Sequence, residues 1–234
     1  MPSMPRSWPI RPPHALRSLA TPRRPGLGHP CLARRIAALN KLRTQTKNQL
    51  HAAQLTATTL DFLIADLQQS ITQLDAQIES LRQRARDLIA TDEQLQHACD
   101  LLIGVTGIAD ASAIQLLGEL LVFPDDRQAK QGVAMAGLDP REHQSGSSVN
   151  KKPRLSKAGN RYLCLALYMP DLSATHHDPN VRAYYYHLID DRGLKKLQPL
   201  CAVMRKLLLA IHAMLKTQTP FDSSRFYSTS ETTA

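Results

Sequence analysis

A seven-residue repeat runs through the chain from Leu60 to Leu88. Leucine recurs at every seventh position from Leu60 to Leu88, and Ile64, Ile71, Ile78 and Ala85 each stand three residues before the next leucine. Four such heptads predict one long helix with an apolar seam, and a second helix must cover that seam to keep it from water. Isoleucine and leucine at the two core positions favour a two-stranded parallel coiled coil when chains pair.

Two coverings of this seam are open. Residues 32–53 read as a basic amphipathic helix, with Ile36, Leu39 and Leu50 on one face. This helix can pack on the seam as an internal hairpin, or the seam can pair chains into a homodimer or higher oligomer. In either case residues 31–92 are predicted to be coiled-coil helices.

Charge is distributed in blocks along the chain. Residues 1–60 hold 10 basic and no acidic side chains, residues 61–144 hold 6 basic and 14 acidic, and residues 145–217 hold 12 basic and 4 acidic. Two basic blocks favour a polyanionic partner such as DNA, because phosphate neutralisation dominates nucleic-acid affinity. The alternative is a protein whose basic tail has no such partner. Residues 1–30 also contain eight prolines and are predicted to be a disordered Pro/Arg-rich arm.

Composition excludes several classes of protein. Only 5% of residues are aromatic, which favours an all-α fold: a coiled-coil stalk followed by a compact helical domain. The four cysteines form no C-x-x-C pair, so neither a disulfide framework nor a metal site is indicated. No apolar run approaches the length of a membrane span. We therefore expect a cytoplasmic protein that has no membrane partner.

A helix, a tight turn and a second helix are predicted over residues 101–121. Gly107 can adopt the positive φ that closes such a turn, which makes the segment helix-hairpin-helix-like. Elements of this kind present turn amides and a helix N-terminus to a backbone phosphate. A purely structural helical hairpin fits the same residues, because Asp110 and Glu119 make the segment acidic.

The polar stretch from residue 141 to 160 carries the candidate chemistry. A Ser/Gly run that includes Ser145 precedes a cluster of candidate nucleic-acid-binding side chains: Lys151, Lys152, Arg154, Lys157, Asn160 and Arg161. A serine that attacks a phosphodiester needs charge stabilisation on the phosphate oxygens, which such cations supply. Composition alone also fits a flexible loop, and Asn160 also fits the N-cap of a helix.

Ordered motifs over residues 100–222 resemble the C-terminal domain of the IS110 insertion-sequence transposases. The matching segments are Ala136–Pro140, Gln144–Gly146, Leu155–Arg161, Ala166–Pro170, Met204–Leu208 and Pro220-Phe221. The coiled-coil region resembles the central part of that family with looser motifs. The resemblance divides the chain into the arm, the coiled coil, a transposase domain over residues 93–222 and a tail over 223–234.

The resemblance implies DNA transposition guided by an element-encoded RNA. In the family an N-terminal RuvC-like domain binds Mg²⁺ through four carboxylates, and the C-terminal domain supplies a serine that becomes joined to a DNA strand. Ser145 is then the candidate nucleophile, with DNA and a guide RNA as partners. The resemblance also implies a bacterial protein that is associated with the nucleoid. No acidic residue precedes Asp61, so this sequence resembles a truncated member that holds no cofactor and is inactive alone. The rival interpretation is a noncatalytic nucleic-acid-binding and dimerisation module.

Overall fold

The computed structural model describes residues 30–56, 60–121, 128–145, 149–156 and 158–227, with the backbone alone for residues 141–154. Eight α-helices, two β-strands and one short 3-10 helix lie in these ranges. The predicted disordered arm lies outside the described residues except for Pro30, and so does the end of the predicted tail. The helical fold class is therefore confirmed for most of the described chain, with one β-hairpin as the exception.

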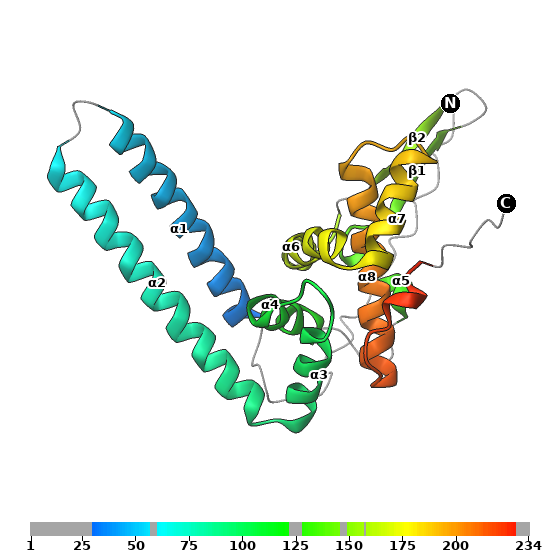
Figure 1. Cartoon of the computed structure of the whole chain (residues 1–234), viewed down its shortest axis with the longest axis horizontal. Helices are drawn as coiled ribbons and strands as arrows, with labels where there is room; N and C mark the ends of the chain where they lie inside the picture. The colour runs from blue at the N-terminus through cyan, green and yellow to red at the C-terminus, as the bar shows by residue number, and fades with distance from the viewer. Residues whose placement is uncertain (1–29, 57–59, 122–127, 146–148, 157, 228–234) are drawn as a thin grey trace, which may run out of the picture.

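Helices α1 (Cys31–Leu55) and α2 (Asp61–Ala90) lie side by side and project away from the remaining elements (Figure 1). Ile36 of α1 and Leu74 and Ile78 of α2 are buried where the two helices meet. The heptad seam of α2 is thus covered within the chain, as in the internal-hairpin interpretation. Pairing between chains stays a prediction.

The seam is not covered along its whole length. Near the outer end of the hairpin the seam residue Leu60 is 61% exposed, whereas Leu74 is 8% exposed. We call α1 and α2 the stalk and the remaining described elements the body. Burial is therefore concentrated in the half of α2 that is nearer the body.

Helices α3 (Glu93–Ile103) and α4 (Asp110–Leu120) form the predicted helix–turn–helix pair. The Asp92 carboxylate begins α3 as its N-cap and accepts hydrogen bonds from the Gln94 and Leu95 amides. Gly107 in the turn has a φ of 97°, the positive value that its sequence context predicted.

After helix α5 (Ala129–Met135) the chain forms an antiparallel hairpin of β1 (Pro140–Ser145) and β2 (Val149–Leu155). The prediction of an all-α fold with a flexible stretch here was wrong. Arg141 pairs with Arg154 and His143 pairs with Lys151, so β2 has one more residue than β1 between these pairs. Pro153 lies in that bulge, where its missing N–H removes no regular ladder bond.

Helices α6 (Arg161–His177), α7 (Pro179–Asp190) and α8 (Leu197–Thr217) complete the body around one apolar core shared with α3 and α4. Helix α6 continues through Pro170, which lies in its interior. Pro170 removes one intrahelical hydrogen bond, and the buried face on both sides of it keeps the helix together.

The described part of the predicted tail is packed against the body. Residues Ser223–Arg225 form the 3-10 helix η1, and the ring of Phe226 is 3% exposed and meets the Tyr184 ring edge-on at 5.8 Å. Among the described helices none combines the length and hydropathy needed to cross a membrane.

Candidate nucleic-acid interface

Two hydrogen bonds hold the base of the β-hairpin together. The Ser156 amide donates to the Asp139 carbonyl at 3.0 Å, and the Ser156 hydroxyl donates to the Asp139 carboxylate at 2.7 Å. Both residues belong to the motifs that carry the family resemblance. Their geometry fixes where the strands leave the body.

Gly159 lies at a point where two segments of backbone nearly touch. A Cβ atom at this position would overlap the Met135 carbonyl and lie 2.6 Å from the Gly137 amide nitrogen. Any side chain here would force the α5 C-terminus and the start of α6 apart. The glycine of this motif therefore serves close packing beneath the hairpin.

Asn160 is a structural residue in this arrangement. Its carboxamide oxygen accepts from the Tyr162 and Leu163 amides as the N-cap of α6, and its carboxamide nitrogen donates to Glu119 at 2.5 Å. The backbone amide of Asn160 donates to the Met135 carbonyl. With both side-chain atoms engaged, the N-cap interpretation is confirmed. A direct nucleic-acid contact by Asn160 stays untested.

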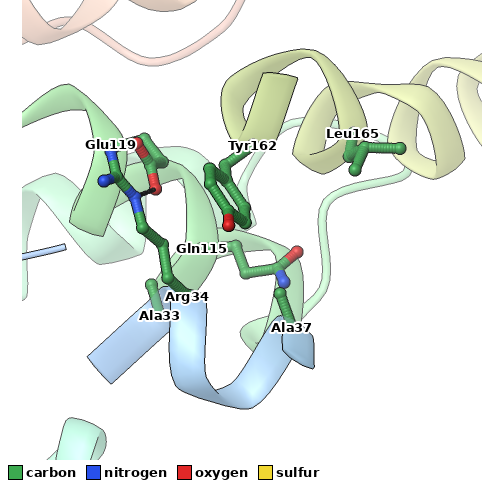
Figure 2. Close-up of a pocket in the computed structure, with 7 residues that line it drawn as sticks. All are labelled: Ala33, Arg34, Ala37, Gln115, Glu119, Tyr162 and Leu165. Atoms are coloured by element: carbon green, nitrogen blue, oxygen red, sulfur yellow. Dashed lines mark hydrogen bonds and ion pairs between the residues drawn. The ribbon is translucent and has the colours of Figure 1, made fainter. Parts of the chain in front are cut away.

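Glu119 joins the stalk to the body. Its carboxylate is 1% exposed and receives two charge-assisted hydrogen bonds from the Arg34 guanidinium, at 2.8 and 2.9 Å (Figure 2). The hydrogen bond to Glu119 raises the pKa of Arg34 above its ordinary value. The same guanidinium lies over the Tyr162 ring, 4.9 Å from its centre. We call Arg34, Glu119 and Asn160 the polar hub.

The sequence did not single out Glu119 or Arg34 as hub residues. Glu119 was noted only as an acidic residue in a predicted hairpin. Its signal was a charged residue in a short helix that is apolar on nearly every side, with Ile114, Leu116 and Leu117 all buried. A buried acid of that kind needs a cationic or hydrogen-bonding partner.

The predicted catalytic and binding residues share one strand pair and its exit. Ser145 is the last residue of β1 and pairs in register with Val149. Lys151, Lys152 and Arg154 lie on β2, and Arg161 is the exposed first residue of α6. Lys157 lies outside the described residues. The hairpin backbone thus brings the serine segment and the basic strand side by side.

Gly107 does not lie on an open surface. A Cβ atom at this glycine would overlap the Pro170 carbonyl and lie 3.0 Å from the Ala174 amide nitrogen, because the turn packs on α6. The side of Gly107 on which a Cβ atom would lie is therefore covered by helix α6. The geometry favours the structural-hairpin interpretation of this element, and a DNA contact by the turn stays a prediction.

Asp171 is a further buried acid of the body. It is fully buried on α6, and among the described residues neither of its carboxylate oxygens has a hydrogen-bond partner. Desolvation raises its pKa well above the usual value for an aspartate. Among the described residues there is no group of three or more His, Cys, Asp or Glu side chains that could hold a metal ion.

Comparison with known proteins identifies relatives of this chain. Residues 99–186 match the model of the IS116/IS110/IS902 transposase family. The chain is 33% identical over 153 residues to the pilin gene-inverting protein of Moraxella bovis, a match that covers 65% of this chain and 45% of that protein. The same protein of Moraxella lacunata is 32% identical with the same coverage.

A third relative comes from an insertion element. The 43.6 kDa protein of the insertion element IS110 in Streptomyces coelicolor is 27% identical over 168 residues, which is 70% of this chain and 39% of that protein. The chain therefore matches less than half the length of each of these three relatives.

Proposed function

Because residues 99–186 form a domain of the IS116/IS110/IS902 transposase family, we propose that this chain binds DNA through its β-hairpin and takes part in DNA strand exchange. The observation that carries the proposal is the hairpin itself, in which the Ser145 segment is paired with a basic strand. Inversion of a gene, the activity in the name of the Moraxella relatives, is itself an exchange of DNA strands.

Lys151, Lys152 and Arg154 are the proposed contacts to DNA phosphates. They lie within four residues on β2, and the hydrogen bonds of Ser156 to Asp139 hold the base of that strand to the body. Guanidinium and ammonium groups on a fixed strand neutralise neighbouring phosphates and release their counterions. Arg161 at the exposed start of α6 extends the same surface.

Ser145 is the proposed nucleophile. Its hydroxyl oxygen forms a bond to the phosphorus of a phosphodiester while the bond from phosphorus to the leaving sugar oxygen breaks, and the hydroxyl proton passes to a base. No step of this proposal is routed through Mg²⁺. The carboxylates of the family mechanism must then come from another chain or segment.

The salt dependence of DNA binding tests the binding part. We expect the triple change Lys151→Ala, Lys152→Ala and Arg154→Ala to flatten the slope of log affinity against log salt by about 2–3 for duplex DNA. The matched control removes the same charge from the exposed loop before α8, by Arg192→Ala, Lys195→Ala and Lys196→Ala. Equal slopes for the two triple variants would overturn the assignment.

A denaturing gel with labelled DNA tests the catalytic part. The chain by itself is expected to bind DNA without forming a covalent adduct in Mg²⁺. Addition of a full-length relative that carries its own carboxylates but a Ser→Ala change at the matching position is expected to produce an adduct on this chain. An adduct that survives Ser145→Ala rules out this nucleophile. Binding without any adduct in the mixture supports the noncatalytic module.

A further inference from the structure

One face of α6 is unusually apolar for an exposed surface. Leu165 is 58% exposed, Met169 is 62% exposed, and Tyr162 and Tyr168 are 39% and 40% exposed. At 100° per residue these four side chains and the exposed Arg161 project within one third of the helix circumference. We call Arg161, Tyr162, Leu165, Tyr168 and Met169 the α6 face.

Helix α1 of the stalk forms a basic wall beside this face, because its Ala33, Arg34 and Ala37 line a pocket together with Tyr162 and Leu165. Helix α1 has no acidic residue between its first and last positions, and its Arg35, Lys41 and Lys47 are exposed. At the start of α1, the Arg34 guanidinium already lies on the Tyr162 ring (Figure 2). The acid at that point, Glu119, is neutralised by Arg34 and bonded by Asn160.

A cavity of about 240 Å³ opens between the α6 face and the stalk. Leu165 and Met169 of the α6 face line it together with four further apolar residues, and its polar lining consists of Asn40, Arg82, Ser112 and Gln115. None of the described residues that line it is acidic. The cavity thus offers an apolar ledge, two amides, a hydroxyl and a guanidinium.

The Arg82 guanidinium is not fully used within the chain. Its Nε is buried and has no hydrogen-bond partner among the described residues, and its nearest carboxylate, on Glu79, is 3.8 Å away. Glu79 is instead held by Arg86, which also pairs with Asp110 at 3.0 Å. Both neighbouring acids are therefore neutralised without Arg82.

We propose that the α6 face and this cavity bind unpaired nucleotides of a nucleic-acid strand, which is a site distinct from the β-hairpin. Tyr168 and Tyr162 stack bases, Arg82 binds a phosphate, and Asn40 and Gln115 donate to or accept from base edges. The inference rests on the proposed function, because Arg161 connects this site with the hairpin surface that binds duplex DNA.

Size and charge select this occupant. A cavity of this volume accepts one base and excludes a duplex, whose bases are paired and stacked. Proteins bind single strands without sequence preference by combining aromatic side chains, which stack on bases, with a positively charged surface, which follows the phosphates. The exposed tyrosines of the α6 face lie beside helix α1, which carries positive charges and no acidic residue. A protein helix would use the apolar residues of the face but would leave the Arg82 Nε and the cations of α1 without partners.

Binding of a labelled 20-nucleotide single strand, as DNA and as RNA, to the full chain tests the proposal by fluorescence anisotropy. Tyr168→Leu, which keeps an apolar side chain, is expected to weaken single-strand binding about tenfold and to leave duplex binding unchanged. Arg82→Ala is expected to weaken single-strand binding severalfold. It is also expected to reduce the slope of log affinity against log salt by about 0.7, the value for one phosphate contact.

Matched controls separate stacking and charge from general effects on the fold. Tyr186 is a 51% exposed tyrosine of α7, and Arg84 is an exposed arginine two residues from Arg82. Tyr186→Leu and Arg84→Ala are expected to bind like the wild type. Equal effects of target and control variants overturn the proposal, as does a Tyr168→Leu change that alters only the sedimenting mass. Duplex binding is expected to weaken only in the triple variant of Lys151, Lys152 and Arg154, so the failure of the proposed function can be told apart from the failure of this proposal.

Discussion

Glu119 concentrates several long-range contacts in one carboxylate. It is bonded by Arg34, 85 residues earlier, and by Asn160, 41 residues later. Burying a carboxylate is costly unless cations and donors surround it, and removal of one partner leaves the other groups unsatisfied. The hub therefore links the first turn of α1, the middle of the chain and the start of α6.

Glu119→Gln keeps an oxygen that can accept from Asn160 and removes the charge opposite Arg34. We expect it to lower the free energy of unfolding by about 1–2 kcal/mol, discounted because Arg34 is partly exposed. A double-mutant cycle with Arg34→Gln, followed by urea unfolding, measures the coupling. Glu93→Gln on the exposed first turn of α3 is the control and should change stability by less than about 0.5 kcal/mol. Strictly additive effects of the two hub changes would contradict the pairing.

Asp171 makes the stability of the body depend on pH. Because burial raises its pKa in the folded chain, the folded state holds this proton more tightly than the unfolded state does. Its contribution is complete below the ordinary pKa of an aspartate and is lost as the pH rises through the raised pKa. Burial and the nearby Asp171 charge likewise raise the pKa of the Cys164 thiol, with burial the larger cause.

Asp171→Asn removes the ionisation but preserves the shape of the side chain. The melting temperature of the variant relative to the wild type should therefore rise between pH 4 and pH 8, with a stability gain of roughly 1–3 kcal/mol at the upper end. Calorimetry at a series of pH values measures the difference. A difference that is constant across this range would show that Asp171 does not titrate as described.

In the stalk, the heptad repeat of α2 packs against α1 of the same chain. Antiparallel contact with α1 buries Leu74, Ile78, Ala85 and Ile89 of α2 inside one chain. The most exposed apolar residue of α2, Phe62 at 70%, lies near the outer end of the hairpin, with Leu63 beside it at 43%, while Leu88 near the body is 39% exposed. Self-association of the chain, if driven by apolar burial, then belongs to that end and not to the covered half.

Two substitutions separate these roles of the stalk. Leu74→Asp is expected to lower the helical content and melting temperature, at a cost of about 3 kcal/mol, because it places a charge in the α1–α2 contact. Phe62→Asp is expected to preserve the fold and reduce the sedimenting mass at tens of micromolar. Thr72→Asp on the exposed side of α2 is the control for both. A wild-type chain that sediments as a monomer would contradict the oligomer prediction.

The whole molecule depends on close contact between stalk and body. A Cβ atom at Gly118 of α4 would lie 2.7 Å from the Ala33 Cβ of α1, so the two helices touch there without room for a methyl group. Together with the polar hub, this contact makes the base of the stalk part of the body's core. The stalk is therefore anchored at a defined angle.

Two glycine substitutions test this anchoring by their opposite signs. Gly118→Ala is expected to destabilise the chain by about 1–3 kcal/mol, because the added methyl group meets Ala33. Gly132→Ala in α5 meets no atom within 4 Å and is expected to stabilise it by about 0.5–1 kcal/mol. Thermal unfolding of both variants compares them directly. A stabilising Gly118→Ala would show that α1 and α4 are not in contact.

The sequence alone was sufficient for features that neighbouring residues encode. Helical periodicity located the long helices, the position of Asn160 before an apolar run predicted an N-cap, and Gly107 predicted a positive φ. Ordered motifs also predicted the family that the comparison then identified over residues 99–186. Each of these signals depends on the residues of a single helix or on a short motif.

Only the tertiary structure decided how distant segments meet. The heptads could not tell whether α1 or a second chain covers α2, because both coverings bury the same stripe. The strand pair was missed because its register includes a bulge and the strands lack the alternation of a half-buried strand. The Glu119 partners and the α6 face depend on which helices pack together, and the energies that choose among packings are spread over contacts far apart in the sequence.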